Sequence, residues 1–241
     1  MDFYNNKKVV DEFLFHRNKT DDPISAIEEV VIHDLINKFE GNVLDLGCGF
    51  GDNSSFYINK GFSHYYGIDS SEVMLDLAKK NNSNFKQMTF INCNITEFDY
   101  PTEKFDLIIS RMTLHYIDLI GEVFNLIHRS LKHGGQFIFS VEHPIVTSSL
   151  DLPRSSLPKS FWKVDNYHHS GERKHKWLGS EVTKYHRKLE DYWSYLMTSN
   201  FKVESIKEGN PTEENFHSKE EYIRRKRTPL FLIISARKEQ M

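Results

Sequence analysis

Apolar positions follow two different periods along the chain. Short apolar runs predict strands, and they span residues 43–46, 65–68, 89–91, 105–109 and 137–141. Helical segments separate the runs. The clearest of them places apolar side chains on one helix face, at Ile120, Val123, Phe124, Ile127 and Leu131. Strands that alternate with helices predict a parallel sheet covered on both faces.

The two ends of the chain extend this scheme. The first 40 residues predict helices, because Ile27, Val31 and Leu35 share a helix face, and Ser25 with Glu28 resembles a capping box. Near the C-terminus, residues 185–200 predict a helix, and residues 201–206 and 230–236 predict two closing strands. The strands together predict a doubly wound α/β fold with a seven-stranded, mostly parallel sheet.

The segment between the fifth strand and the last helix shows no period. Residues 145 to about 180 hold Pro153, Pro158, Gly171 and Gly179 among aromatic residues and histidines. A loop of this length in a compact domain is usually functional. We therefore expect a cap inserted after the fifth strand, which closes over a site at the edge of the sheet.

Composition and charge are those of an ordinary globular protein. Of the 241 residues, 39% are hydrophobic, which is enough for one domain with a real core. The 31 basic and 34 acidic residues give a net charge of −3, which provides no field for nucleic acid. The short basic run at 224–227 is interpreted as a solvated helix end, because a phosphate-binding face needs a broader basic patch.

Cysteine content and hydropathy disfavour other classes of protein. Cys48 and Cys93 form neither a disulfide framework nor zinc-ligand spacing. No apolar run approaches the roughly 20 residues that a membrane span needs, and the N-terminus is too polar for a signal peptide. We expect a cytoplasmic protein.

The most informative motif is the glycine-rich turn after the first strand. Gly47, Gly49 and Gly51 alternate with other residues, and Asp45 lies two positions before the first glycine. Glycines let the backbone approach a ligand closely. A dinucleotide site prefers the spacing G-x-G-x-x-G for its pyrophosphate, whereas an acid here suits a ligand with an ammonium or sulfonium group. The alternative is a turn that only joins a strand to a helix.

Two further strand ends carry polar residues that suit a nucleoside. Asp69 ends the second strand, where a carboxylate can accept both ribose hydroxyls, or it could only cap the next helix as Ser70 and Ser71 do. Asn94 follows the third strand beside Ile95. It could read an adenine edge or serve as a turn residue.

Together these segments resemble the class I S-adenosylmethionine-dependent methyltransferases. The glycine motif, Asp69, the strand at 105–110 and residues 131–135 occur in that family's order, over residues 40 to 145. The resemblance implies S-adenosylmethionine as the cofactor and S-adenosylhomocysteine as its product.

The resemblance also implies which residues bind the cofactor. Asp45 and the neighbouring glycines would line its methionine half, Asp69 would hold the ribose, and Asn94 with Ile95 would flank the adenine. Two residues at the end of the fourth strand would close the site. The family often has an aspartate where this chain has Asn94. The full predicted set is Asp45, Gly47, Cys48, Gly49, Asp69, Ser70, Met74, Asn94, Ile95, Ser110 and Arg111.

A narrower resemblance links later segments to a bacterial group of small-molecule-type methyltransferases. The segments that carry it are 140–144, 162–165, 177–179 and 184–187. It implies methyl transfer to a small molecule and leaves the acceptor open. A single domain, 1–241, would then comprise N-terminal helices (1–40), a cofactor-binding core (41–144), a substrate lid (145–180), and a closing helix and strands (181–241).

Methyl transfer from a sulfonium is an in-line displacement that depends on positioning. A base is needed only where the acceptor keeps its proton at neutral pH. We predict two candidate catalytic histidines, His143 after the fifth strand and His186 at the start of the helix after the lid, although each could be structural. The histidines of the lid have no acidic or cysteine partner at ligand spacing, so we expect no metal.

The acceptor is expected under the lid, next to His115. Trp162, Tyr167 and Trp177 could form an aromatic wall that also attracts the sulfonium, or they could anchor the lid to the core. Arg173 could bind an acidic acceptor or carry surface charge.

Three other functions compete with this hypothesis. The glycine spacing and Asp45 disfavour a nicotinamide-dependent oxidoreductase. The charge balance, and the lack of an Asn/Asp-Pro-Pro-aromatic motif after the fourth strand, disfavour a nucleic-acid methyltransferase. A regulatory protein that binds S-adenosylmethionine without catalysis stays open. We expect a small-molecule acceptor as partner, no nucleic acid, no membrane, and a monomer or homodimer.

Overall fold

The fold is built on one large twisted sheet. A computed structural model describes residues 3–149 and 162–239 of the chain. The seven-stranded sheet has the order β3-β2-β1-β4-β5-β9-β8, and β9 alone runs antiparallel to its neighbours. Its strands are β1 (Asn42–Leu46), β2 (His64–Asp69), β3 (Met88–Asn92), β4 (Phe105–Arg111), β5 (Leu131–Glu142), β8 (Phe201–Lys207) and β9 (Phe231–Lys238). This architecture confirms the doubly wound, mostly parallel α/β fold.

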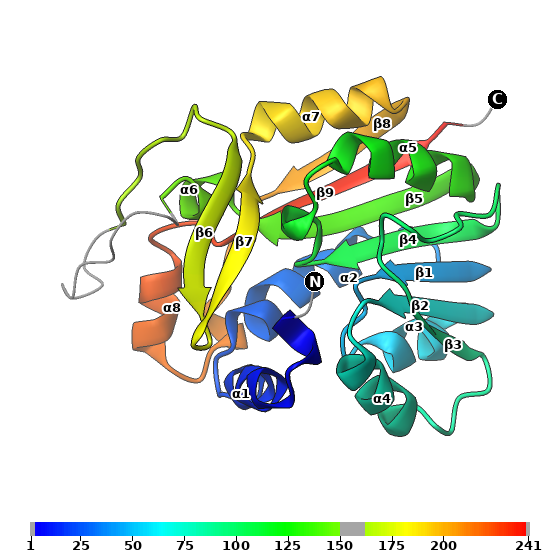
Figure 1. Cartoon of the computed structure of the whole chain (residues 1–241), viewed down its shortest axis with the longest axis horizontal. Coiled ribbons are helices and arrows are strands. Elements are labelled where there is room, and N and C mark those ends of the chain that lie inside the picture. Colours follow the sequence, from blue (N-terminus) through cyan, green and yellow to red (C-terminus); the bar gives the residue numbers. More distant parts are fainter. Residues whose placement is uncertain (1–2, 150–161, 240–241) are drawn as a thin grey trace.

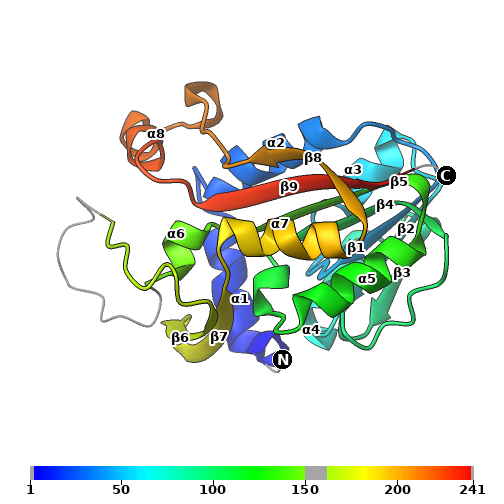
Figure 2. The same cartoon turned by 90° about the horizontal axis from the view of Figure 1, so that it is seen from above.

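Helices cover both faces of the sheet (Figures 1 and 2). They are α1 (Lys7–Arg17), α2 (Val30–Leu35), α3 (Ser54–Lys60), α4 (Glu72–Asn81), α5 (Ile120–Ser130), α6 (Pro144–Thr147), α7 (Leu189–Thr198) and α8 (Lys219–Arg225). A short π-helical segment, Ile24–Glu29, leads into α2. Figure 2 shows α2 and α3 on one face and α5 and α7 on the other. Within the described residues, no helix has the length and apolar character that crossing a membrane requires.

Alternate residues of the buried strands pack into two separate hydrophobic cores. Leu44 and Phe137 pack with the apolar faces of α5 and α7, whereas Val43 and Ile138 pack with α2 and α3. This alternation follows from the two-residue period of a strand, and it fixes the strand register because a one-residue slip would exchange the two cores.

The segment after β5 differs from the prediction. It contains an antiparallel hairpin, β6 (Gly171–Trp177) and β7 (Ser180–His186), where no periodic structure was expected. The next helix begins at Leu189, so His186 ends a strand and does not start a helix. The hairpin was hidden because its inward positions are polar except for Val182, and the polar ones are Arg173, His175, Lys184 and His186. Part of the predicted lid, residues 150–161, lies outside the described residues.

The predicted capping box at Ser25 and Glu28 is also wrong. The Asp22 carboxylate accepts hydrogen bonds from the backbone N–H and the hydroxyl of Ser25. Glu28 is fully buried and points into the protein. Its carboxylate accepts a hydrogen bond from Arg111 Nη2 at 2.7 Å and another from Ser140 Oγ at 2.5 Å. One buried carboxylate therefore ties the N-terminal helices to the ends of β4 and β5.

Glu28→Ala should destabilise the fold strongly, because it leaves the buried Arg111 guanidinium without its main partner. We expect a loss of about 3–5 kcal/mol in the free energy of unfolding, measured by urea denaturation. The matched control is Glu40→Ala, which breaks a surface pair with Lys38 in which both side chains are mostly exposed and should change stability little. Similar small effects of both changes would contradict the assigned role.

Candidate active site

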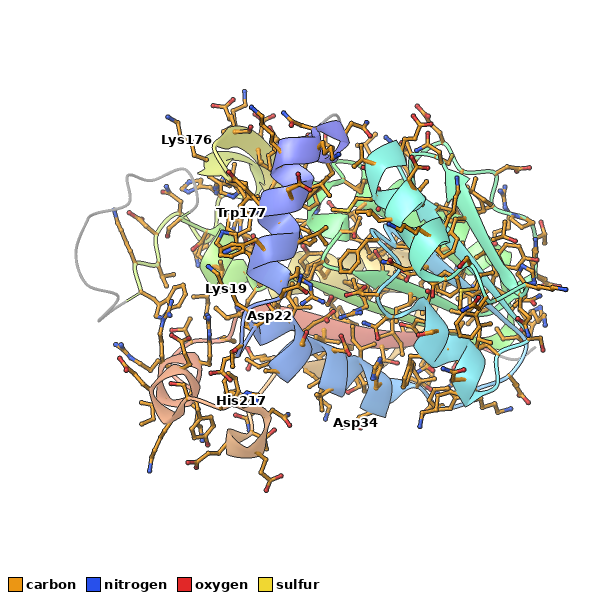
Figure 3. All side chains as sticks on the ribbon, turned by 90° about the horizontal axis from the view of Figure 1, so that it is seen from below. Lys19, Asp22, Asp34, Lys176, Trp177 and His217 are labelled. Carbon is orange, nitrogen blue, oxygen red and sulfur yellow. The ribbon has the colours of Figure 1, made fainter. Side chains whose placement is uncertain are left out.

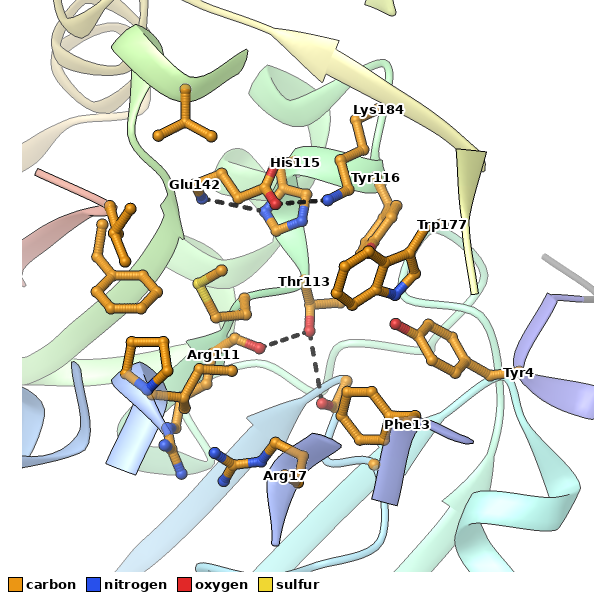
Figure 4. Close-up of a pocket in the computed structure, with 18 of the residues that line it drawn as sticks. Tyr4, Phe13, Arg17, Arg111, Thr113, His115, Tyr116, Glu142, Trp177 and Lys184 are labelled. Carbon is orange, nitrogen blue, oxygen red and sulfur yellow. Dashed lines mark hydrogen bonds and ion pairs between the residues drawn. The ribbon is translucent and has the colours of Figure 1, made fainter. Parts of the chain in front are cut away.

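A cavity of about 1800 Å³ lies at the carboxyl ends of the parallel strands, where ligands bind in open α/β sheets. Residues that end or follow β1, β2, β3, β4 and β5 form its floor. Helix α1, the β6–β7 hairpin and α8 supply its walls, and all three lie towards the same end of the sheet (Figure 1). Figure 4 shows labelled side chains of α1, of the hairpin and of the ends of β4 and β5 converging on the cavity.

The glycine turn after β1 is held by hydrogen bonds to β2 on one side and faces free space on the other. Gly47 and Cys48 both donate their backbone N–H to the carbonyl of Ile68, at 2.8 and 3.0 Å. Gly47 has φ of 79°, and a Cβ there would lie 2.4 Å from the Thr113 side chain. Gly49 has φ of 54°, and a Cβ there would have no neighbour within 4 Å, so this stretch of backbone faces free space. The turn can therefore bring a ligand directly against the backbone.

Asp45 places a carboxylate with an unused hydrogen-bonding atom at the edge of this turn. It is 5% exposed, and its Oδ2 accepts a hydrogen bond from the Tyr65 hydroxyl at 2.7 Å. Within the described residues, its Oδ1 is buried without a partner. Burial raises the pKa of Asp45 to about 7, although the Tyr65 hydroxyl opposes this shift. A cationic group bound here would restore the charged form.

Asp69 holds the glycine turn against the start of α4. Its Oδ2 accepts from the backbone N–H of Gly49 at 2.9 Å and its Oδ1 from that of Ser71 at 2.8 Å. Burial raises the pKa of Asp69, and these two backbone donors counter the shift. Each carboxylate oxygen has a further lone pair, so both roles considered for Asp69, helix cap and ribose acceptor, are compatible.

The other predicted cofactor contacts mostly line the same cavity. Cys48, Ser70, Met74, Asn94, Ile95 and Arg111 do so. Asn94 also acts as a turn residue, since its Oδ1 accepts from Thr96. Ser110 is the exception. It is fully buried and donates its hydroxyl to the Leu46 carbonyl at 2.8 Å, which joins β4 to β1.

A second polar cluster lies where β4 and β5 end beneath the hairpin (Figure 4). Lys184 Nζ donates to Glu142 Oε1 at 2.6 Å, and Lys184 also lies 5.4 Å from the centre of the Tyr116 ring. Burial alone would raise the pKa of Glu142, but Lys184, with His115 and His175, outweighs burial and lowers the pKa to about 2. Glu142 is therefore ionised across the working pH range of most proteins.

His115 completes this cluster as a neutral side chain. It is 1% exposed, and burial, followed by the nearby Lys184, lowers its pKa to about 3. Its Nδ1 accepts the backbone N–H of Glu142 at 3.4 Å. A neutral imidazole that accepts at Nδ1 carries its proton on Nε2. His115 therefore offers a hydrogen-bond donor, and in this tautomer it cannot take a proton at Nε2.

The two histidines predicted as catalytic lie outside the cavity lining. His143 Nδ1 accepts from the Ile145 backbone, and its Nε2 lies 3.0 Å from Glu208 Oε1. His186 is fully buried between the Thr147 hydroxyl and the Tyr167 carbonyl. Both rings thus have partners on both nitrogens, and these contacts match the structural alternative considered for each.

The predicted aromatic wall is present in part. Trp162 and Trp177 line the cavity, whereas Tyr167 and Arg173 do not. Arg173 donates to the carbonyl of His169 and supports the base of the hairpin. The Trp177 ring lies 6.4 Å from that of His16 in α1, and Figure 3 shows it beside this helix, with Lys19 and Asp22 just beyond the helix end. The hairpin and α1 therefore meet across the cavity mouth.

Several residues of the cavity were not predicted. They are Glu142, Lys184, Tyr116, Thr113, Tyr4, Phe13, Arg17, Arg224 and Arg225. Glu142 and Lys184 lie in segments that the narrower resemblance had marked. The register of the hairpin is what turns Lys184 inward, and the mixture of polar residues in β7 gave no sign of it.

Comparisons with known proteins agree with this arrangement. Residues 37–200 match the model of a family described as a methyltransferase domain. A protein from Listeria monocytogenes, described as an S-adenosylmethionine-dependent methyltransferase, has a crystal structure that is 31% identical, with a TM-score of 0.81 over 88% of this chain and 97% of that one. A second such structure, from Mesorhizobium loti, is also 31% identical, with a TM-score of 0.81 over 89% and 99% of the two chains.

Curated relatives extend the same picture. A Haemophilus influenzae protein without an assigned function is 29% identical over 90% of both chains. Malonyl-[acyl-carrier protein] O-methyltransferase 1 of Ilyobacter polytropus is 27% identical over 79% of this chain and 75% of its own length. With the family match, the sheet order and the glycine turn, the chain belongs to the methyltransferase domain family, among the class I enzymes that use S-adenosylmethionine as their cofactor.

Proposed function

We propose that this protein transfers the methyl group of S-adenosylmethionine to a small-molecule acceptor bound in the same cavity. The observation that carries the proposal is the Oδ1 of Asp45, which has no partner within the described residues and lies buried beside an open glycine turn, in one cavity with the His115 cluster. The cavity also exceeds the roughly 300–1,000 Å³ of a pocket for one small ligand. It has room for a cofactor and an acceptor together.

The residues at the β1–β3 side suit the cofactor. Asp45 would pair with its ammonium group and Asp69 with its ribose hydroxyls, while Met74 and Ile95 offer apolar contacts to the adenine. S-adenosylmethionine supplies a methyl group on a sulfonium, an electrophile that an acceptor atom can displace in line. The chain has to hold the acceptor atom along that line and keep water out.

The His115 cluster suits the acceptor. His115 Nε2 and the Lys184 ammonium can donate hydrogen bonds, and both point to an acceptor held by its lone pairs. Neither His115 nor the ionised Glu142 is a strong base near neutral pH. We therefore infer an acceptor atom that arrives without a proton to lose, such as an anionic oxygen or a free amine.

The finer predictions are retained as proposals. The net charge of −3 supports a small molecule over nucleic acid as acceptor. A cytoplasmic location and a monomeric or homodimeric state stay predictions from the sequence.

The first experiment is a calorimetric comparison of cofactors. S-adenosylhomocysteine should bind, and a nicotinamide dinucleotide should not, because Asp45 would repel a pyrophosphate at this turn. Tight nicotinamide binding without any response to S-adenosylhomocysteine would overturn the proposal. Release of S-adenosylhomocysteine from S-adenosylmethionine over a panel of metabolites would then separate an enzyme from a regulatory protein.

The affinity for S-adenosylhomocysteine should depend on pH through Asp45. The carboxylate must be ionised to attract the ligand's ammonium, and its pKa before the ligand binds is about 7. Affinity should therefore be constant above that pH and fall by up to about tenfold per pH unit below it. Asp45→Asn should weaken binding and remove this dependence. Tyr65→Phe should move the midpoint upward, because the Tyr65 hydroxyl stabilises the ionised carboxylate. An unchanged affinity between pH 6 and 8 in the unmodified protein would refute the assignment.

His115→Gln should lower kcat/KM for the acceptor by about tenfold, which is the value of one lost neutral hydrogen bond. Its affinity for S-adenosylhomocysteine should stay the same. The matched control is His143→Gln, a histidine outside the cavity lining, which should leave both quantities near their original values. The opposite ranking in steady-state kinetics would return the catalytic role to His143.

A further inference from the structure

Helix α8 closes one end of the cavity and is firmly anchored there. Asp21, just after α1, accepts hydrogen bonds from the backbone N–H groups of His217 at 2.6 Å and Ser218 at 3.0 Å. Ser218 in turn caps α8 by accepting from the Glu221 N–H at 3.3 Å. These contacts join segments that are far apart in the sequence, and they fix the direction in which the side chains of α8 point.

The basic run at the end of α8 divides into two halves. Lys226 and Arg227 are exposed, as expected for a solvated helix end. Arg224 and Arg225 instead line the cavity, and their side chains are only 26% and 15% exposed. The interpretation of the run as a solvated helix end is therefore wrong for these two arginines. Arg225 lies close enough to Asp22, beyond the end of α1, for the two charges to interact.

Arg224 and Arg225 share a single carboxylate. Arg224 Nη1 lies 2.8 Å from Glu221 Oε1, and Arg225 Nη2 lies 3.4 Å from Glu221 Oε2. The Nε atoms of both arginines are buried without a hydrogen-bond partner in the part of the chain that the structure describes. Two guanidinium groups thus face one carboxylate, which leaves positive charge uncompensated.

The neighbouring groups do not remove this excess. Asp22 and Asp52 also line this part of the cavity, but both carboxylates already pair with Arg17. Burial lowers the pKa of Arg225, Arg224 lowers it further, and Glu221 with Asp22 only partly compensates. Lys19 and Lys163 add further positive charge to the lining. Asp21 adds a carboxylate that the backbone N–H groups of His217 and Ser218 already occupy. This end of the cavity is therefore suited to an anion.

We propose that Arg224 and Arg225 bind an oxyanion, a carboxylate or a phosphate, that the methyl acceptor carries. A planar guanidinium forms paired hydrogen bonds with either group, so the arginine pair would set the orientation of the acceptor along the cavity. The inference rests on the proposed function, because it assigns a chemical class to the acceptor of that site. The carboxyl or phosphoryl group would lie at the α8 end, and the apolar and aromatic lining between would contact the rest of the molecule.

The test uses inorganic phosphate as the probe and the protein saturated with S-adenosylhomocysteine, so that phosphate cannot occupy the cofactor site. Binding is followed by calorimetry and by the fluorescence of Trp162 and Trp177, which line the cavity. Phosphate affinity should fall at least tenfold in the double variant Arg224→Gln/Arg225→Gln. It should be unchanged in Lys226→Gln, which removes a positive charge from the adjacent exposed position.

Glu221→Gln provides a test of opposite sign. It removes the carboxylate that competes for the two guanidinium groups, so it should strengthen phosphate binding at least threefold. A purely structural role of the cluster predicts weaker or equal binding in this variant. Either of those results, or equal phosphate affinity in the unmodified protein and the double variant, would overturn the proposal.

Acetate and acetamide distinguish the source of the oxyanion and separate this inference from the proposed function. Binding of acetate in preference to phosphate points to a carboxylate acceptor and the reverse to a phosphorylated one, whereas acetamide should not bind in either case. Equal binding of acetamide and both anions would overturn the proposal. If S-adenosylhomocysteine binds every variant and neither anion binds the unmodified protein, the inference fails and the proposed function stands. If S-adenosylhomocysteine does not bind, the proposed function itself fails.

Discussion

The buried pair of Glu28 and Arg111 is the interaction on which the site depends. Arg111 is the last residue of β4, and Glu28 belongs to the helical segment that precedes β1. Their contact, shared with Ser140 of β5, joins three separate parts of the chain beneath the cavity floor. Desolvating two charges is costly, and such a pair stabilises a fold only when its remaining hydrogen bonds are satisfied. Here Ser140 and Glu29 supply further partners for the two charged groups.

The charge of the residues that line the cavity differs from one part of it to another. On the β1–β2 side, Asp45 and Asp69 are carboxylates whose pKa values burial raises, so they gain most from a cation or from hydroxyl donors. At the α8 end, the arginines carry excess positive charge. The lining also contains a neutral imidazole, His115, next to the Glu142–Lys184 ion pair. An asymmetric ligand pair, cationic at one end and anionic at the other, is the complement of this gradient.

The sequence allowed the sheet to be predicted because its buried strands and helix faces are apolar and keep a clear period. The glycine turn, Asp69 and Asn94 were also accessible, since turn geometry and strand ends restrict which residues can occupy them. The hairpin and the two arginines were not. Their inward positions are mostly polar, so burial there depends on tertiary partners such as Glu142 and Glu221 and leaves no hydrophobic period. Ser110 lies outside the cavity lining, because its hydroxyl is used by the carbonyl of the neighbouring strand.

Several buried polar atoms in the cavity lining have no hydrogen-bond partner within the described residues, and this lowers the stability of the protein without its ligands. Asp45 Oδ1, Glu142 Oε2 and the Nε atoms of the α8 arginines are all buried without a hydrogen bond within the described residues and belong to side chains that line the cavity, whereas Tyr57 Oη and Arg187 Nη1 are such atoms outside the lining. An unsatisfied buried polar atom costs about 1–3 kcal/mol. Selection for stability alone would replace these side chains with apolar ones, which fill space without that cost. The four atoms in the cavity lining are the ones whose hydrogen bonds ligands could complete, so that the bound state would recover stability that the protein alone gives up.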